Sequence, residues 1–220
     1  MDCTYTTLLH GCLLMSISHA IMTNVYPNLS YEQSWDGCSF SMVDGCGSRG
    51  TISFATDFCV GAIRNEEHEL ISGEDTIISN ILDFSASARD LAKREALQYL
   101  LDDIEGEAIP SISSIFYCDQ AGIRTPVSLH RNFQNDMTLF YPCFLPYKQA
   151  VAAIKEYYDM DSQSLTLLEE LFRQKREDLS AEIVLDKRQV SLVPGDGICQ
   201  ECINSLAELK IYIQQSDAKN

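Results

Sequence analysis

The chain of 220 residues is 45% hydrophobic and carries a formal net charge of -16 at pH 7. A chain of this size and composition can bury a sizeable core, which excludes a disordered polar tail. The negative charge disfavours nucleic acid and anionic membranes as partners, because both are polyanions. It favours a basic partner, or only a well-solvated surface.

Nine cysteines do not indicate a disulfide framework in this sequence. Their number is odd, the chain is long, and seven of them are scattered between Cys3 and Cys143 without a recurrent spacing. A reducing, cytoplasmic compartment is the simpler interpretation of this pattern.

An apolar run lies near the start of the sequence, from Leu8 to Met22. It is too short to span a bilayer, and as a signal sequence it would lack a basic N-terminal region. We therefore predict that residues 1–24 form a buried first helix, with a secretion signal as the alternative. Pro27 ends the pattern.

Residues 35–65 alternate and are interrupted by glycines, which predicts a small antiparallel sheet. Phe40 and Met42 should share one side of a strand, and Ile52 and Phe54 one side of the next.

Within this region, residues 44–52 (DGCGSRGTI) match the pattern G-x-G-x-x-G. A dinucleotide-binding loop of this kind would lead into a helix, but Thr51–Phe54 alternates like a strand. A protein kinase places its glycine loop between strands, yet Arg64 stands where its lysine is needed and Asn132 where its base is needed. We therefore predict turns at Asp36-Gly37 and Asp44-Gly45, with Gly47 and Gly50 permitting a bulge or a positive φ.

Residues Ile77–Leu82 show a short stretch of helical periodicity. The strongest helical pattern follows it and spans residues 85–104. Ser85 or Ser87 would cap this helix and Gly106 would stop it. Its predicted apolar stripe consists of Ala88, Leu91, Ala92, Leu97, Leu100, Leu101 and Ile104.

Four carboxylates, Asp102, Asp103, Glu105 and Glu107, gather at the predicted C-terminal end of this helix. Negative charge there opposes the helix dipole, at roughly 0.3 to 1 kcal/mol for each well-placed residue. A cluster that lowers stability suggests a surface for a basic protein partner. The spacing is not that of an EF-hand loop, so we expect no metal.

Further along, residues 109–117 are predicted as a strand and residues 122–136 mostly as a loop. Pro146 should begin a helix that carries Val151, Ile154 and Tyr158, and a second helix should span residues 164–176. Residues 181–193 are predicted as a hairpin or two short strands, followed by a turn at 194–197 and a helix that ends near Gln214. Residues 215–220 should be frayed. With no repeat or linker, residues 1–220 are predicted to form a single α+β domain, a small antiparallel sheet packed by several helices.

Cys199 and Cys202 form the one C-x-x-C pair of the chain. They could be a redox pair at a helix N-terminus, or half of a zinc site whose second half is missing. Because they continue a helical stripe with Leu206, Leu209 and Ile213, we favour a buried, structural role.

Hydrolase motifs are absent from the sequence, which contains neither G-x-S-x-G nor H-E-x-x-H. His10, His19, His68 and His130 lie far apart, and His68 between two glutamates is predicted in a solvated loop. A catalytic site that folding assembles from distant residues stays an alternative.

Residues 34–54 (SWDGCSFSMVDGCGSRGTISF) and 95–117 (EALQYLLDDIEGEAIPSISSIFY) resemble immunity proteins encoded beside bacterial polymorphic toxins. The resemblance covers only part of the chain and carries no residue-level binding motif. It implies a cytoplasmic, non-enzymatic, cofactor-free protein that blocks a cognate toxin by binding it. Asp102, Asp103, Glu105 and Glu107 would then cover a basic toxin domain. The alternatives are a thiol redox enzyme that uses Cys199 and Cys202, and a scaffold protein without a discrete site.

Overall fold

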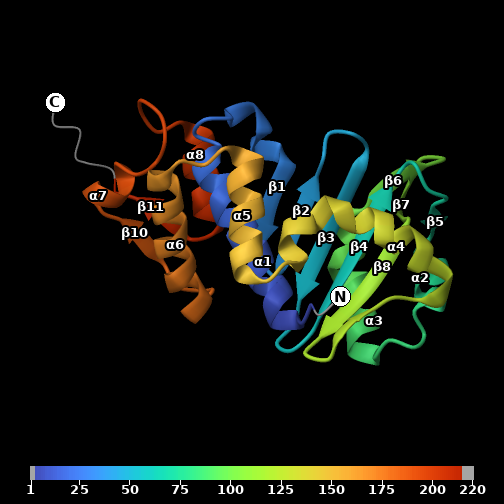
Figure 1. Cartoon of the computed structure of the whole chain (residues 1–220). Helices are drawn as coiled ribbons and strands as arrows, with labels where there is room; N and C mark the ends of the chain where they lie inside the picture. The colour runs from blue at the N-terminus through green and yellow to red at the C-terminus, as the bar shows by residue number, and fades with distance from the viewer. Residues whose placement is uncertain (1–2, 215–220) are drawn as a thin grey trace.

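The computed structural model describes residues 3–214, and its centre is a six-stranded antiparallel sheet in the order β1-β2-β3-β4-β8-β9 (Figure 1). Its strands are β1 (Gln33–Asp36), β2 (Ser39–Val43), β3 (Ser48–Phe54), β4 (Cys59–Asn65), β8 (Ser114–Asp119) and β9 (Gly122–Arg124). The first four strands are consecutive along the chain, as the glycine-rich region predicted. The α+β fold class is confirmed.

Side chains that alternate along these strands build two cores on opposite faces of the sheet. Phe40 and Met42 share the first core with Ile52 and Phe54, which confirms the predicted alternation. Val60 belongs to the second core. The central strands are therefore buried on both faces.

Helix α1 (Tyr5–Met22) covers the first face and is itself surrounded. Thr4 caps it by accepting a hydrogen bond from the Thr7 amide, and residues 11–23 are all buried. The buried helix predicted for residues 1–24 is thus confirmed over Tyr5–Met22, and residues 1–2 lie outside the described residues. Its neighbours are η4 (Met137–Phe144), α5 (Tyr147–Tyr158), α6 (Ser162–Glu177) and α8 (Gln200–Glu208). Between residues 3 and 214, no helix combines the length and the apolar character needed to cross a membrane.

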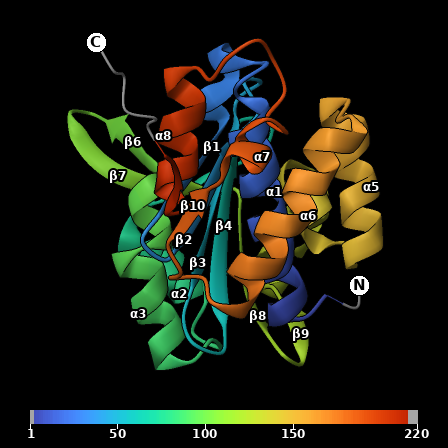
Figure 2. The same cartoon turned by 90° about the vertical axis from the view of Figure 1, so that its left-hand side faces the viewer.

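The second face is covered by helices from the middle of the chain, which lie across the sheet from α5 and α6 (Figure 2). They are α2 (Glu74–Asn80), α3 (Ala86–Arg94) and the 3-10 turn η2 (Ala96–Tyr99). A three-stranded sheet in the order β5-β7-β6 adjoins them, built from β5 (Ile71–Ser72), β6 (Leu101–Ile104) and β7 (Glu107–Ile112).

The helix predicted over residues 85–104 is correct only in its first half. Ser85 caps α3 by accepting a hydrogen bond from the Ala88 amide, and α3 ends at Arg94. The following segment forms η2 and then β6, because Glu105 and Gly106 both have positive φ, 57° and 88°, which suits a two-residue hairpin turn. Strand β6 therefore pairs with β7.

The C-terminal predictions also need correction. Residues 181–193 form no hairpin: β10 (Ile183–Leu185) pairs in parallel with β11 (Ile211–Ile213), and α7 (Lys187–Val190) follows β10. The last helix, α8, ends at Glu208 rather than near Gln214. The frayed tail predicted for residues 215–220 lies outside the described residues.

Predictions for the middle of the chain are partly confirmed. Helices α5 and α6 agree with the two predicted after Pro146. Residues 109–117 belong to two strands, β7 and β8, that separate at Ser113. The predicted loop at 122–136 contains β9, η3 (Val127–Leu129) and α4 (His130–Asp136), and η1 (Pro27–Glu32) follows the first helix.

The glycines of the G-x-G-x-x-G pattern, and Gly37 before them, form backbone turns or permit close packing. Gly37, Gly45 and Gly47 have positive φ of 56°, 68° and 107°, which confirms the predicted turns. Gly50 differs, because a Cβ there would lie 2.6 Å from the Phe140 ring. Its role is close packing beneath η4, not a bulge or a positive φ.

Candidate functional sites

The four predicted partner-binding carboxylates lie on a β-hairpin and not at a helix C-terminus. Asp102 and Asp103 belong to β6, Glu105 to the turn, and Glu107 to β7. The loss of stability that carboxylates would cause at a helix C-terminus therefore does not arise here. The structure nevertheless keeps the four residues together, at the end of a hairpin that projects from the body of the molecule (Figure 2).

Asp102 has an internal role that separates it from the other three. Its carboxylate accepts hydrogen bonds from Arg49 on β3 and from Arg64 Nε on β4, the second at 2.6 Å. Arg49 also donates to the Leu101 carbonyl at 2.9 Å. These contacts between half-buried groups tie the hairpin to the large sheet.

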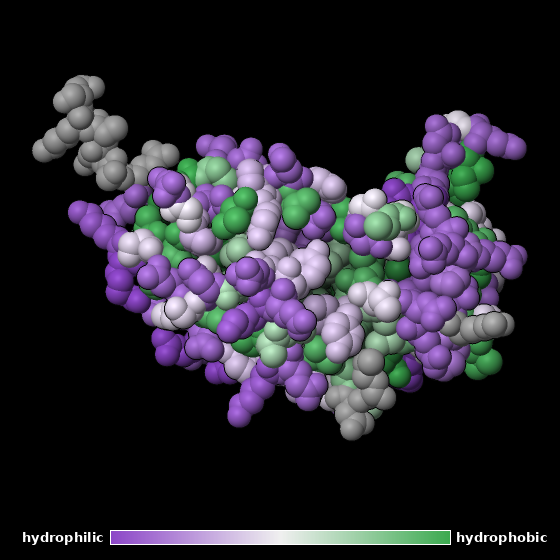
Figure 3. All heavy atoms as spheres, turned by 45° about the horizontal axis from the view of Figure 1, so that its top comes forward, coloured by the Kyte–Doolittle hydropathy of each residue, from purple (hydrophilic) through white to green (hydrophobic). Residues whose placement is uncertain are grey.

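Asp103, Glu105 and Glu107 are exposed. Asp103 Oδ1 accepts a hydrogen bond from the Gly106 amide at 2.8 Å, which stabilises the turn. None of the three forms an ion pair with another of the side chains that the structure describes. In Figure 3 the projection on the right, where the hairpin lies, is hydrophilic. Three carboxylates are therefore available to a partner.

Cys199 and Cys202 sit at the N-terminus of α8, as predicted. Cys199 Sγ accepts a hydrogen bond from the Cys202 amide at 3.4 Å and so caps the helix. Cys202 is fully buried, and burial raises the pKa of its thiol to about 12. A raised pKa disfavours the nucleophilic thiolate. The burial and the raised pKa of Cys202 favour a structural role for this residue.

A buried polar cluster around Asp136 brings together residues that are distant in sequence. Ser113 and Ser114 donate hydrogen bonds of 2.6 and 2.7 Å to its Oδ2, while Asn65 donates to its Oδ1 at 3.2 Å. His68 lies in a loop between the exposed Glu67 and Glu69, as predicted, but its side chain is half-buried, with Nε2 3.3 Å from Oδ1 of Asp136.

This cluster contains serine, aspartate and histidine, but in an arrangement unsuited to nucleophilic catalysis. In a catalytic triad the histidine lies between the nucleophile and the carboxylate. Here Asp136 lies between them, and both serine side chains are fully buried and donate to it. The cluster instead fastens the end of α4 to the strands β4 and β8.

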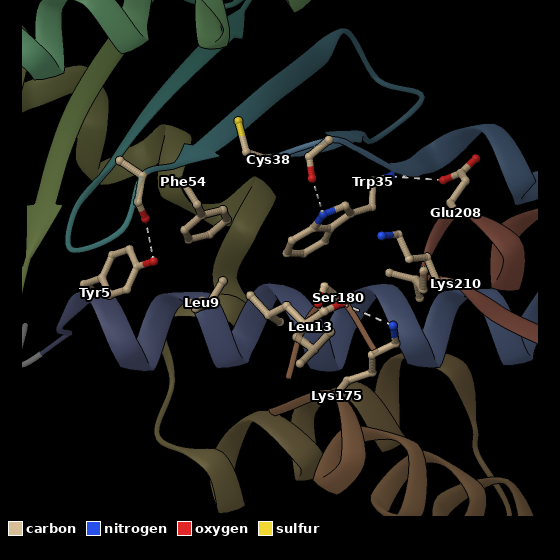
Figure 4. A pocket seen from close by; sticks show the side chains of 14 residues that line it. Tyr5, Leu9, Leu13, Trp35, Cys38, Phe54, Lys175, Ser180, Glu208 and Lys210 are labelled. Carbon is tan, nitrogen blue, oxygen red and sulfur yellow. Dashed lines mark hydrogen bonds between the residues drawn. The ribbon is translucent and has the colours of Figure 1, made fainter. Parts of the chain in front are cut away.

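Sequence analysis did not predict the cavity that lies between α1 and the β1–β2 turn (Figure 4). It has a volume of about 380 Å³. Trp35 and Phe54 form its upper wall, with their rings stacked at 5.9 Å and 2°. Leu9 and Leu13 of α1 lie opposite.

Charged side chains complete this cavity at one end. Lys175 of α6, Glu208 at the end of α8, and Lys210 line it. No single segment carries a signal for the site, because its walls come from α1, β1 and the turn after it, the end of β3, α6 and the chain around α8.

A second cavity, of about 450 Å³, lies among Met15, Met42, Tyr141 and Tyr157. Its charged lining residues, Asp44 and Glu156, are both exposed. Water solvates both carboxylates, so this cavity contains no buried charge that a ligand would need to neutralise.

Within residues 3–214, no group of three or more His, Cys, Asp or Glu side chains is placed to hold a metal ion. A comparison of the chain with protein-family models, with curated proteins and with solved structures found no match.

Proposed function

We propose that this chain is a non-enzymatic, cytoplasmic binding protein that inhibits a basic protein partner, in the way an immunity protein neutralises a toxin. The contact surface would be the end of the β6–β7 hairpin. The observation that supports this proposal is that four neighbouring carboxylates have different roles. Asp102 is ion-paired inside the molecule, whereas Asp103, Glu105 and Glu107 are exposed and unpaired among the described residues.

The anchoring of the hairpin supports a binding role for its tip. Because Arg49 and Arg64 hold Asp102, the backbone that carries the three exposed carboxylates is fixed before a partner arrives. A preorganised surface loses less conformational entropy on binding. The net charge of -16 would also steer a basic partner toward the protein.

A basic protein encoded by a gene next to that of this chain is the first partner to test. Association is measured by stopped-flow at low and at high salt, with the wild type and with the triple variant Asp103→Asn, Glu105→Gln, Glu107→Gln. We expect fast, salt-sensitive association for the wild type, and about tenfold slower association for the variant at low salt.

The matched control is the triple variant Glu169→Gln, Glu177→Gln, Glu182→Gln, which changes the net charge by the same amount elsewhere. These three side chains are also exposed. The control should associate nearly as fast as the wild type. If both triple variants slow association equally, only the total charge matters, and the hairpin is not the contact surface.

A further inference from the structure

We propose that the cavity between α1 and the β1–β2 turn binds a small amphipathic carboxylate. Its apolar body would lie between Trp35 and the leucines of α1, and its carboxylate would meet Lys175 and Lys210. The lining of the cavity shares no residue with the acidic hairpin.

The walls of the cavity suit an apolar body. Trp35 stacks on Phe54, and Tyr5 meets the same Phe54 ring edge-on at 6.0 Å. The polar groups of the two flanking aromatic residues are already bonded: Trp35 Nε1 donates to the Gly37 carbonyl at 3.2 Å, and the Tyr5 hydroxyl donates to Ala55 at 2.8 Å. These rings therefore present mainly apolar surface to a ligand.

Lys175 supplies the charge that makes this cavity selective. The residue is 1% exposed, yet none of the ion pairs among residues 3–214 includes it. Its ammonium donates to the carbonyls of Leu179 and Ala181, at 3.2 and 2.5 Å. An ammonium has three N–H donors, so one is left for a ligand oxygen.

A buried cation that is paired with no carboxylate is costly, and a second cation increases that cost, although the more distant Asp178 and Glu182 reduce it in part. Burial, and secondarily the nearby Lys210 ammonium, lower the pKa of Lys175. A carboxylate placed between the two lysines would provide the missing negative charge. Figure 4 shows both lysine side chains at the same end of the cavity, beyond the Trp35 ring.

Three carboxylates of the protein also lie near this end of the cavity. None of them supplies the negative charge that a bound ligand carboxylate would bring to Lys175. Glu208 lines the cavity, but its Oε2 accepts a hydrogen bond from the Trp35 amide at 3.0 Å. Asp178 and Glu182 are exposed to water. Because the lining contains two lysines and one glutamate, an anion fits it better than a cation.

The volume limits the size of the ligand. A cavity of about 380 Å³ lies at the lower end of the range for small-molecule sites, about 300 to 1,000 Å³. It accommodates a carboxylic acid with a short aliphatic or a single aromatic body.

The test uses the chain's one tryptophan, Trp35, as a built-in reporter. Its fluorescence is titrated with octanoate, octanol and octylamine, which share an apolar body and differ in the head group. We expect a saturable change with octanoate, with an affinity about tenfold higher than that of octanol. Octylamine should bind most weakly.

Variants identify the site of binding. Lys175→Met should weaken octanoate binding about tenfold and leave octanol binding nearly unchanged, whereas Lys155→Met, on the exposed side of α5, should change neither. Leu9→Phe reduces the volume of the cavity and should lower the affinity for all three compounds. It also keeps the test decisive if Lys175→Met fails to fold. Equal affinities for octanoate and octanol, or no saturable signal with octanoate, would overturn the proposal.

Discussion

Arg64 on β4 donates a hydrogen bond of 2.6 Å to the carboxylate of Asp102 on β6, so that an ion pair fastens the small sheet to the large one. The Arg64 and Asp102 side chains are 14% and 21% exposed, so water screens the pair only partly. This pair turns a protruding hairpin into a fixed element of the fold.

Asp102→Asn removes the negative charge and should lower the free energy of unfolding by about 2 kcal/mol, because it weakens charge-assisted hydrogen bonds at a half-buried position. Chemical denaturation measures this loss. Asp103→Asn, one residue further on and exposed, should change stability by less than about 0.5 kcal/mol. Equal effects of the two substitutions would contradict the anchoring role of Asp102.

His19 should make stability depend on pH. Burial lowers its pKa from 6.5 to about 4, and its Nδ1 lies 3.0 Å from the Tyr158 hydroxyl. The unfolded chain takes up this proton near pH 6.5, whereas the folded protein resists it until about pH 4. The contribution of His19 is therefore complete above pH 6.5 and is lost as the pH falls through this window, by about 3 kcal/mol in total.

Denaturation of the wild type and of His19→Gln between pH 4 and 7.5 isolates this contribution, because the carboxylates titrate in both proteins. The difference in unfolding free energy between the two should change with pH mainly below 6.5. His130→Gln, at an exposed position, serves as the control and should follow the wild type. A constant difference between wild type and His19→Gln would show that His19 is not held neutral.

Gly11 should not tolerate a side chain. A Cβ there would lie 2.1 Å from the Cys143 carbonyl oxygen, a backbone atom that cannot move aside freely. Gly11→Ala should therefore destabilise the protein by about 3 kcal/mol, although alanine favours helices. Gly197→Ala is the control, since a Cβ there meets nothing within 4 Å, and its thermal unfolding should match that of the wild type.

Thiol reactivity distinguishes the structural role of the cysteines from a redox role. Cys46 is exposed, Cys38 and Cys199 are half-buried, and the other six are buried. A thiol reagent added to the native protein should react with one cysteine rapidly, and Cys46→Ser should abolish that phase. All nine should react after unfolding. Rapid joint reaction of Cys199 and Cys202 in the native protein would instead support the redox alternative.

Predictions from sequence succeeded where the signal is local. Helices α5 and α6 each carry an apolar stripe within a single segment, and their ends lie within a few residues of the predicted ones. The glycine turns succeeded for the same reason, because Gly37 and Gly45 determine the backbone at their own positions.

The failures have a different physical origin. Leu97 and Leu100 are buried, as a helical stripe would require, but the chain after them pairs with β7 through a turn that Glu105 and Gly106 permit. Strand β10 pairs with β11, which follows two intervening helices, α7 and α8. In both cases tertiary pairing, which periodicity does not report, determined the secondary structure.

The two candidate sites also differ in how far the sequence indicates them. The carboxylates of the hairpin are close in sequence and could be found by inspection, although their helical setting was wrong. Lys175 belongs to a segment that the sequence presents as an amphipathic helix. Only the chain that folds back over it, at Leu179 and Ala181, reveals that its ammonium is buried.

Helix α1 has a consequence for how the protein is made. Its residues 11–23 are all buried, and much of their cover comes from α5, α6 and α8, which lie more than 120 residues further along the chain. During synthesis, at about 5–20 residues per second, the apolar surface of α1 stays incompletely covered for about 10 to 40 seconds. This interval makes α1 the natural segment for a chaperone to bind, and folding of the first core must wait until the chain through α8 has left the ribosome.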